Sequence, residues 1–452
     1  MYKPLKPCKF MKPYKVDNSQ DDIFSPRLSR MLNPAHELIK LGQLIPWEEF
    51  EEEFGKLYVG ARGQPPKPIR LIVGLMMLQH MQGISDEEVV QLWIENPYWQ
   101  IFCGYDFLQW EFPTDPSSLT RWRQRIGEEG LKKILEATVK TALKSGAVKE
   151  QSCKKAIVDT TVMEKNVTFP TDGKLYQKAI QLLGKKAKKA GLELRQSYKR
   201  VSKHTLRKMN QYAYARQMNR MKREGRRLKT YLGRIRRDIG RGLAQRGELQ
   251  GIFEPTLKMV DRLLSQKRED SNKLYSLHAP ETECIAKGKA HKKYEFGCKV
   301  SLVITHKEGL CLSSQALHGS PYDGHTLKSA LKEAEAMTGV SIESVFVDRG
   351  YKAHGIEEKK VYRTGQIKGM TASLKKALKR RQAIEPQIGH MKSDGKLGRN
   401  FLKGVFGDKA NALLAGIGHN LRLIRRWIES FFAYFFGWLT ERNVETYLRV
   451  TV

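Results

Sequence analysis

The chain has 452 residues, and its 81 Lys and Arg against 48 Asp and Glu give a formal net charge of +33 and a pI near 9.8. This balance favours polyanionic partners, nucleic acid foremost. No run of 18 apolar residues is present to span a membrane. Six scattered cysteines without a Cys-x-x-Cys pair indicate neither a disulfide framework nor a structural zinc site.

The N-terminus, from Met1 to Lys15, mixes Lys and Pro without an apolar core. Such a composition matches neither a secretory signal nor an amphipathic transit peptide. We therefore expect residues 1–30 to form a basic leader and the protein to stay in the cytoplasm.

Residues 31–147 follow a helical pattern, and we expect an N-terminal helical domain that contacts DNA. The predicted helices are an acidic one around Trp47–Phe54, an apolar one over Pro68–Met81, one opened by the capping box Ser85-Asp86-Glu87-Glu88, and one opened by Asp115-Pro116-Ser117-Ser118. The last carries the candidate DNA contacts Arg121, Arg123 and Arg125. This pattern suits a helix-turn-helix-like module, and it equally suits a purely structural bundle.

A strand is predicted over Lys154–Met163, within a first core segment at residues 148–172. Its apolar run ends on Asp159, where small polar residues begin, which is how a buried strand delivers an acid to the edge of a sheet. A single Asp in such a place more often forms a turn or caps a helix.

Residues 173–285 are predicted to be a basic helical insertion. Between Lys174 and Arg246 there are 24 Lys and Arg against three acidic residues, so this block carries +21 of the net +33. Apolar residues recur through it often enough to give ordered helices with basic outer faces. We expect the insertion to bind nucleic acid, with candidate contacts at Lys199, Arg200, Arg226 and Arg227.

The strand pattern returns in residues 286–426, the second part of the core. The predicted elements are strands over Tyr294–Thr305 and Leu310–Leu317, a helix over Gly324–Met337, a strand that ends on Asp348, and a helix over Ala372–Ile384. This order describes a mixed α+β fold in which helices cover a mixed sheet. A helical tail is expected at residues 427–452.

A third acid, Glu385, follows the last of these helices. Arg381 lies four residues before Glu385 and Lys392 seven residues after it, so the three would share one helix face. Pro386 removes a hydrogen bond and clashes one turn back, so we expect the helix to kink or restart just after Glu385.

Three carboxylates from three elements suit a site that binds two Mg²⁺ ions for phosphodiester cleavage. Asp159 would bridge both ions, Asp348 would bind one, and Glu385 the other. Arg381 and Lys392 would hold DNA phosphates. Further acids close in sequence compete for a place in the site: Glu164, Asp172, Asp323 and Asp394.

Five motifs together resemble a known family. They are Val158-Asp159-Thr160-Thr161, Phe169-Pro170-Thr171-Asp172, Tyr294-Glu295-Phe296-Gly297, Val347-Asp348-Arg349-Gly350-Tyr351, and the series from Arg381 through Glu385-Pro386 to Lys392. From about His36 to Arg426 the chain resembles bacterial insertion-sequence transposases of the DDE class, in the insertion-sequence-five family.

The resemblance implies an RNase H-like (retroviral-integrase-like) core with a five-stranded mixed sheet, in which Asp159, Asp348 and Glu385 are the catalytic, metal-binding triad. It implies two Mg²⁺ ions, with Mn²⁺ as a substitute. It also implies cleavage at terminal inverted repeats, by hairpin formation or direct hydrolysis of the second strand, and transfer into target double-stranded DNA. The protein would act as a homodimer or larger assembly on DNA in the bacterial cytosol, without a membrane.

Three alternatives stay open. The first is a non-catalytic DNA-binding protein derived from a transposase, and the second is a helical nucleic-acid scaffold whose acids are structural. Strong, salt-sensitive binding without a metal requirement would mark the scaffold. The third is a standalone RNase H-like nuclease, marked by cleaved ends that are never joined to a target.

Overall fold

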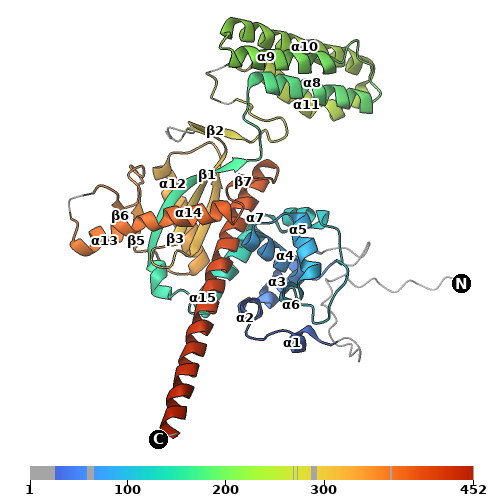
Figure 1. Cartoon of the computed structure of the whole chain (residues 1–452). Coiled ribbons are helices and arrows are strands. Elements are labelled where there is room, and N and C mark those ends of the chain that lie inside the picture. Colours follow the sequence, from blue (N-terminus) through green and yellow to red (C-terminus); the bar gives the residue numbers. More distant parts are fainter. Residues whose placement is uncertain are drawn as a thin grey trace, which may run out of the picture. The chain divides into compact units, whose positions relative to one another are not determined.

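The computed structural model describes residues 26–58, 66–267, 269–271, 273–286, 293–366 and 369–450, with side chains as far as Phe431. Most of the expected basic leader, residues 1–25, lies outside the described residues. The chain divides into two compact units: unit 1 comprises Met1–Glu164 and Cys298–Val452, and unit 2 comprises Lys165–Gly297. In Figure 1, unit 2 contains the green helices.

Helices fill the described chain before the first strand, as predicted. They are α1 (Leu28–Met31), α2 (Glu37–Leu44), α3 (Trp47–Gly55), α4 (Ile69–Gln82), α5 (Asp86–Glu95), α6 (Pro97–Phe102) and α7 (Ser117–Lys144). The capping box is confirmed, since Ser85 Oγ accepts from the Glu88 N–H and Glu88 Oε2 accepts from the Ser85 N–H. Asp115 starts α7 as predicted, because its carboxylate accepts from the Ser117 N–H at 2.8 Å.

The predicted mixed sheet is confirmed. Its strands are β1 (Lys155–Lys165), β2 (Glu283–Ala286), β3 (Tyr294–Thr305), β4 (Cys311–Leu317), β5 (Ser344–Val347), β6 (Lys360–Arg363) and β7 (Arg399–Asn400). In unit 1 the order is β4-β3-β1-β5-β6, with β3 and β4 antiparallel and with β5 parallel to both β1 and β6. Four of these strands, β1, β3, β4 and β5, were predicted from the sequence. The unpredicted β6, the short β7 beside β1 and β2 beside the start of β3 bring the sheet to seven.

Alternation along the strands separates the two faces of the sheet. Ala156 and Val158 join one buried cluster with α12 (Asp323–Thr338) and the N-terminal helices. Ile157 joins another buried cluster with residues of α14 (Ile384–Ser393). The odd-numbered residues around Asp159 therefore face the α14 side, and the even-numbered ones face the α12 side.

The expected boundary at residue 147 is not a break in packing. The helix α4 is buried on all sides, and its cluster extends into the sheet and into α15 (Gly404–Val450). Arg422 of α15 donates to the carbonyls of His80 and Met81, at 2.7 and 3.1 Å, and so satisfies the end of α4. Figure 1 shows α15 running between the N-terminal helices and the sheet, and it continues across the boundary expected at residue 427.

Unit 2 is helical, as expected for the basic insertion. Its elements include α8 (Asp172–Lys189), α9 (Lys199–Tyr214), α10 (Met218–Gln245) and α11 (Gln250–Ser265). Leu228, Leu232, Ile235 and Ile239 recur at helical spacing on α10 and are all buried in a cluster of this unit's own. Among the described helices of the whole chain, none is long and apolar enough to cross a bilayer.

Two buried histidines predict a loss of stability in acid. Burial lowers the pKa of His80 to about 3 and of His419 to about 4, from an ordinary value of 6.5, and His419 Nε2 lies 2.8 Å from the Gly309 carbonyl oxygen. Both rings stay neutral in the folded chain while the unfolded chain binds protons, so stability falls as the pH drops from about 6.5 toward 4. We expect each ring to cost about 1 kcal/mol of unfolding free energy at about pH 5.5.

Urea unfolding at about pH 7.5 and about pH 5.5 measures this loss. His419→Gln should lose about 1 kcal/mol less than the wild type between the two values. The same substitution at the exposed His325 is the control. An unchanged pH dependence in His419→Gln would contradict the prediction.

Candidate active site

The sheet brings Asp159 and Asp348 side by side. Val158 of β1 pairs with Val347 of the parallel strand β5, so the next residues on the two strands occupy neighbouring positions about 5 Å apart. The preceding residues, Val158 and Val347, belong to the buried cluster on the α12 side. Because side chains alternate along a strand, Asp159 and Asp348 face the α14 side of the sheet. The strand predicted over Lys154–Met163 is confirmed as β1, so Asp159 lies inside this strand although the apolar run ends there; β5 is the strand that ends at the site.

Glu385 lies in the first turn of α14. The preceding helix, α13 (Ala372–Arg380), is held on the sheet because Arg380 donates to the carbonyls of His306 and Lys307, at 3.0 and 2.6 Å. A 3₁₀ turn over Arg381–Ala383 then leads into α14. The predicted restart after Glu385 was therefore slightly misplaced: α14 begins at Ile384, because Pro386 is tolerated in a first turn, where its missing N–H has no helical partner.

Arg381 connects two of the three acids. Its side chain is only 9% exposed, Nη1 lies 3.5 Å from Asp159 Oδ2, and Nη2 lies 3.7 Å from Glu385 Oε1. Glu385 itself is 66% exposed, and Asp348 is also exposed. The Arg381 side chain is thus the buried part of the site, and the carboxylates of Asp348 and Glu385 are exposed to solvent.

Sequence reasoning named Asp323 only as a competitor and missed its neighbours. Asp323 Oδ1 accepts from Thr160 Oγ1 at 2.9 Å and pairs with Lys299 Nζ at 2.7 Å. Thr160 also donates its N–H to Asp159 Oδ1 at 2.7 Å. Asp323 is therefore connected to Asp159 through one residue. The alternation of β1 predicts that Thr160 faces the α12 side, but no local pattern identifies Lys299 as its neighbour.

Tyr351 lies beside the same acids. The ring is buried, and burial raises the pKa of its hydroxyl far above the ordinary value, an effect to which the charges of Asp159, Asp323 and Asp348 add. The charges of these three carboxylates thus all act on one buried side chain. The motif Val347–Tyr351 therefore contributes both Asp348 and the buried Tyr351 to the site.

The donor set suits a hard divalent cation. Carboxylate oxygens are the ligands that Mg²⁺ and Mn²⁺ prefer, and positive charge already lies between Asp159 and Glu385 in the form of the Arg381 guanidinium. Within the described residues, however, the oxygens of Asp159, Asp348 and Glu385 are not gathered within 4.8 Å of one another. A cation bridging Asp159 and Glu385 would take over the charge that Arg381 now supplies.

The remaining candidates lie apart from this group. Lys392 is half-buried near the end of α14. Arg121 is exposed on α7, and the exposed Arg125 lies over the rings of Tyr58 and Trp122, at 5.0 and 5.9 Å. Arg123 differs, because it is 3% exposed and its guanidinium is bound to Asp86 and Gln79. We therefore leave Arg123 out of the proposed DNA contacts.

Arg123→Met is expected to lower the free energy of unfolding by about 2 kcal/mol, because it leaves the Asp86 carboxylate partly buried without its cation. Burial alone would raise the pKa of Asp86, yet Arg123 brings that pKa below its usual range. Chemical denaturation measures the loss. Arg121→Met, on the exposed side of the same helix, should stay within about 0.5 kcal/mol of wild type; equal losses in both variants would argue against the buried pair.

Unit 2 presents an exposed basic surface. Lys199, Arg200 and Arg226 are exposed, whereas the exposed Arg227 is paired with the buried Glu224 at 3.0 Å. A cavity of about 240 Å³ in this unit is lined by Arg195, Gln196, Tyr198, Arg234, Arg237, Asp238 and Arg241. Sequence reasoning did not select these arginines, since they come from a loop and two turns of α10.

Comparisons with known proteins match two parts of the chain to transposase families. Residues 26–125 match the model of a transposase domain (DUF772), and residues 276–421 match that of a transposase DDE domain, which includes Asp348 and Glu385. A Rhizobium meliloti protein described as "Uncharacterized protein ORF8 in nfe locus" is 46% identical over 207 residues, which are 46% of this chain and 100% of that protein. No solved structure matches.

Proposed function

We propose, from the premise that this chain belongs to the DDE transposases, that it cleaves DNA at the terminal inverted repeats of an insertion sequence and transfers the 3′-hydroxyl ends into target DNA. The proposal includes an RNase H-like core, two Mg²⁺ ions with Mn²⁺ as a substitute, and the insertion-sequence-five family. One observation carries it: three acids from separate elements lie around the end of β5, where Arg381 lies between Asp159 and Glu385.

The chain's own residues would prepare the phosphodiester for attack. Bound Mg²⁺ would activate water or a 3′-hydroxyl and stabilise the leaving oxygen. Asp159, whose Oδ1 accepts a hydrogen bond from the Thr160 N–H, would hold the ions together with Asp348 and Glu385. Arg381, released from the carboxylates, would bind the scissile phosphate in its bidentate geometry, and Lys392 would bind a neighbouring phosphate.

The remaining surfaces would bind the DNA itself. Unit 2 would contact the terminal repeats through Lys199, Arg200, Arg226 and Arg227, and the N-terminal helices would contribute Arg121 and Arg125. Because two ends must be joined to one target, we propose a homodimer or larger assembly on DNA in the bacterial cytosol.

The deciding experiment incubates the purified protein with DNA carrying the flanking terminal repeats, in Mg²⁺ and in EDTA, together with Asp348→Ala. We expect nicking at the repeat end that requires the metal and is lost in Asp348→Ala, followed by joining to a target plasmid. Asp394→Ala is the matched control, because Asp394 pairs with His390 at the end of α14 at 3.1 Å and should be dispensable.

The outcomes separate the alternatives. Binding without cleavage in any divalent metal would favour a DNA-binding protein derived from a transposase. Cleavage without joining would favour a nuclease. Equal activity in Asp348→Ala and the wild type would remove the proposed site.

A further inference from the structure

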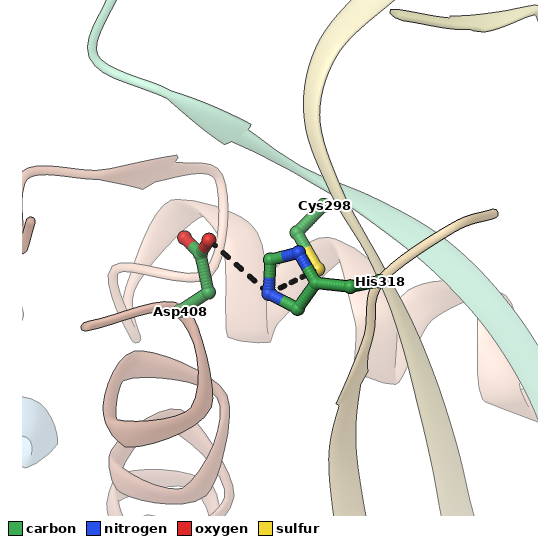
Figure 2. A group of neighbouring side chains, drawn as sticks. All are labelled: Cys298, His318 and Asp408. Carbon is green, nitrogen blue, oxygen red and sulfur yellow. Dashed lines mark hydrogen bonds and ion pairs between the residues drawn. The ribbon is translucent and has the colours of Figure 1, made fainter. Parts of the chain in front are cut away.

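Cys298, His318 and Asp408 form a second cluster, in which the three donor atoms lie within 4.8 Å of one another (Figure 2). Cys298 lies on β3 and His318 directly follows β4; continuing the antiparallel register from Lys299 and Leu317 makes them cross-strand neighbours. Asp408 comes from the first turns of α15. None of these residues belongs to the acidic site described above.

The arrangement differs from a proton relay. In a relay, the thiol and the carboxylate would bind different nitrogens of the imidazole. Here Cys298 Sγ lies 3.7 Å and Asp408 Oδ2 lies 3.5 Å from the same atom, His318 Nε2, as the two dashed lines in Figure 2 show. Three donors that converge in this way suit a cation placed between them.

The distances match a tetrahedral site. Zinc bonds of about 2.3 Å to sulfur and about 2.0–2.2 Å to nitrogen and oxygen place tetrahedral donor atoms about 3.4–3.6 Å apart. The observed separations of 3.7 and 3.5 Å are close to these values. Little movement of the side chains would therefore be needed for binding.

The surroundings orient the donors. Cys298 and Asp408 are buried, at 1% and 2% exposure, while His318 is partly exposed and opens the cluster to solvent. The buried Asn400 donates to Asp408 Oδ1 at 2.7 Å, which leaves Oδ2 turned toward the imidazole. A second hydrogen bond of this kind is typical of carboxylates that ligate metals.

We propose that Cys298, His318 and Asp408 bind one Zn²⁺ ion, with water as the fourth ligand. The thiolate and imidazole select a borderline metal such as Zn²⁺ over Mg²⁺, so this site is chemically distinct from the one at Asp159. Cys298 Sγ lies 3.3 Å from the Lys299 carbonyl oxygen and 3.4 Å from that of Leu317, and metal binding would replace the thiol proton and release it to solvent. The ion clamps the start of α15 to the β3–β4 hairpin.

Cobalt is the probe, because a Co²⁺–thiolate bond gives a charge-transfer band that oxygen ligands do not. Untagged, metal-stripped full-length protein is titrated with Co²⁺ and then with Zn²⁺. We expect about one Co²⁺ with a thiolate band, displacement by Zn²⁺, and a rise in Tm of at least about 3 °C with Zn²⁺.

Cys298→Ala should abolish the band, while Cys311→Ala, at another buried cysteine of the same hairpin, should keep it. Asn400→Ala should weaken binding by about 10–100-fold. A missing band in the wild type, or an unchanged band in folded Cys298→Ala, overturns the proposal. If Cys298→Ala does not fold, His318→Gln is the deciding variant, because this side chain is only partly buried. A Co²⁺ affinity equal to that of the wild type overturns the proposal, and a weakened Co²⁺ affinity supports it.

Discussion

Replacing Asp159 by Asn is expected to lower the rate of metal-dependent DNA cleavage by about 10³-fold, which corresponds to about 4 kcal/mol of transition-state stabilisation. Asp159 is the acid with the most contacts to the other residues of the site. Its neighbour directly after β5 is Asp348, its Oδ2 lies near Arg381, and its Oδ1 accepts a hydrogen bond from the Thr160 N–H. Asparagine keeps the shape but supplies no charge to a bridging cation.

The measurement is the single-turnover cleavage rate on repeat-end DNA, combined with the dissociation constant for the same DNA in EDTA. Binding should stay within about twofold of wild type, because Asp159 itself contributes no cation to the phosphates. Asp394→Asn is the control. A cleavage rate within about tenfold of wild type in Asp159→Asn would show that this carboxylate is structural.

Replacing Lys199, Arg200 and Arg226 together by Ala is expected to weaken DNA binding by about 10²-fold near physiological salt. Each lost phosphate contact lowers the slope of log K against log salt by about 0.9, so three contacts lower it by about 2.7. Between 1 M and 0.15 M salt, log salt changes by about 0.8, and this change multiplied by the slope difference of about 2.7 gives a loss in affinity of about 10²-fold. Arg227 is kept, since its removal would leave the buried Glu224 with only the longer contact to Arg223.

The salt titration itself is the test, because it distinguishes lost phosphate contacts from a damaged fold. Arg236→Ala is the matched control: it also removes one Arg from α10, but that guanidinium is engaged by both oxygens of Asp261, at 2.7 and 2.8 Å. Its slope should stay near wild type. An unchanged slope in the triple variant would place the DNA on other surfaces.

Local sequence patterns predicted many of the helices and strands. The capping box at Ser85, the β-branched run before Asp348 and the apolar helix α4 each depend on neighbours within a few residues, and each was predicted close to its observed bounds. The helix restart was predicted just after Glu385, but α14 begins at Ile384, because a proline is excluded from a helix interior and not from a first turn.

The sequence by itself determined where the acids and the excess positive charge lie along the chain, because composition and short-range periodicity record them directly. Only the tertiary structure decided what each group contacts. It buried Arg123 against Asp86, placed Arg381 beside Asp159, 222 residues away, and set Cys298 beside His318 and Asp408. Such contacts join residues far apart in the chain, and their burial depends on how whole elements pack, which no local pattern encodes.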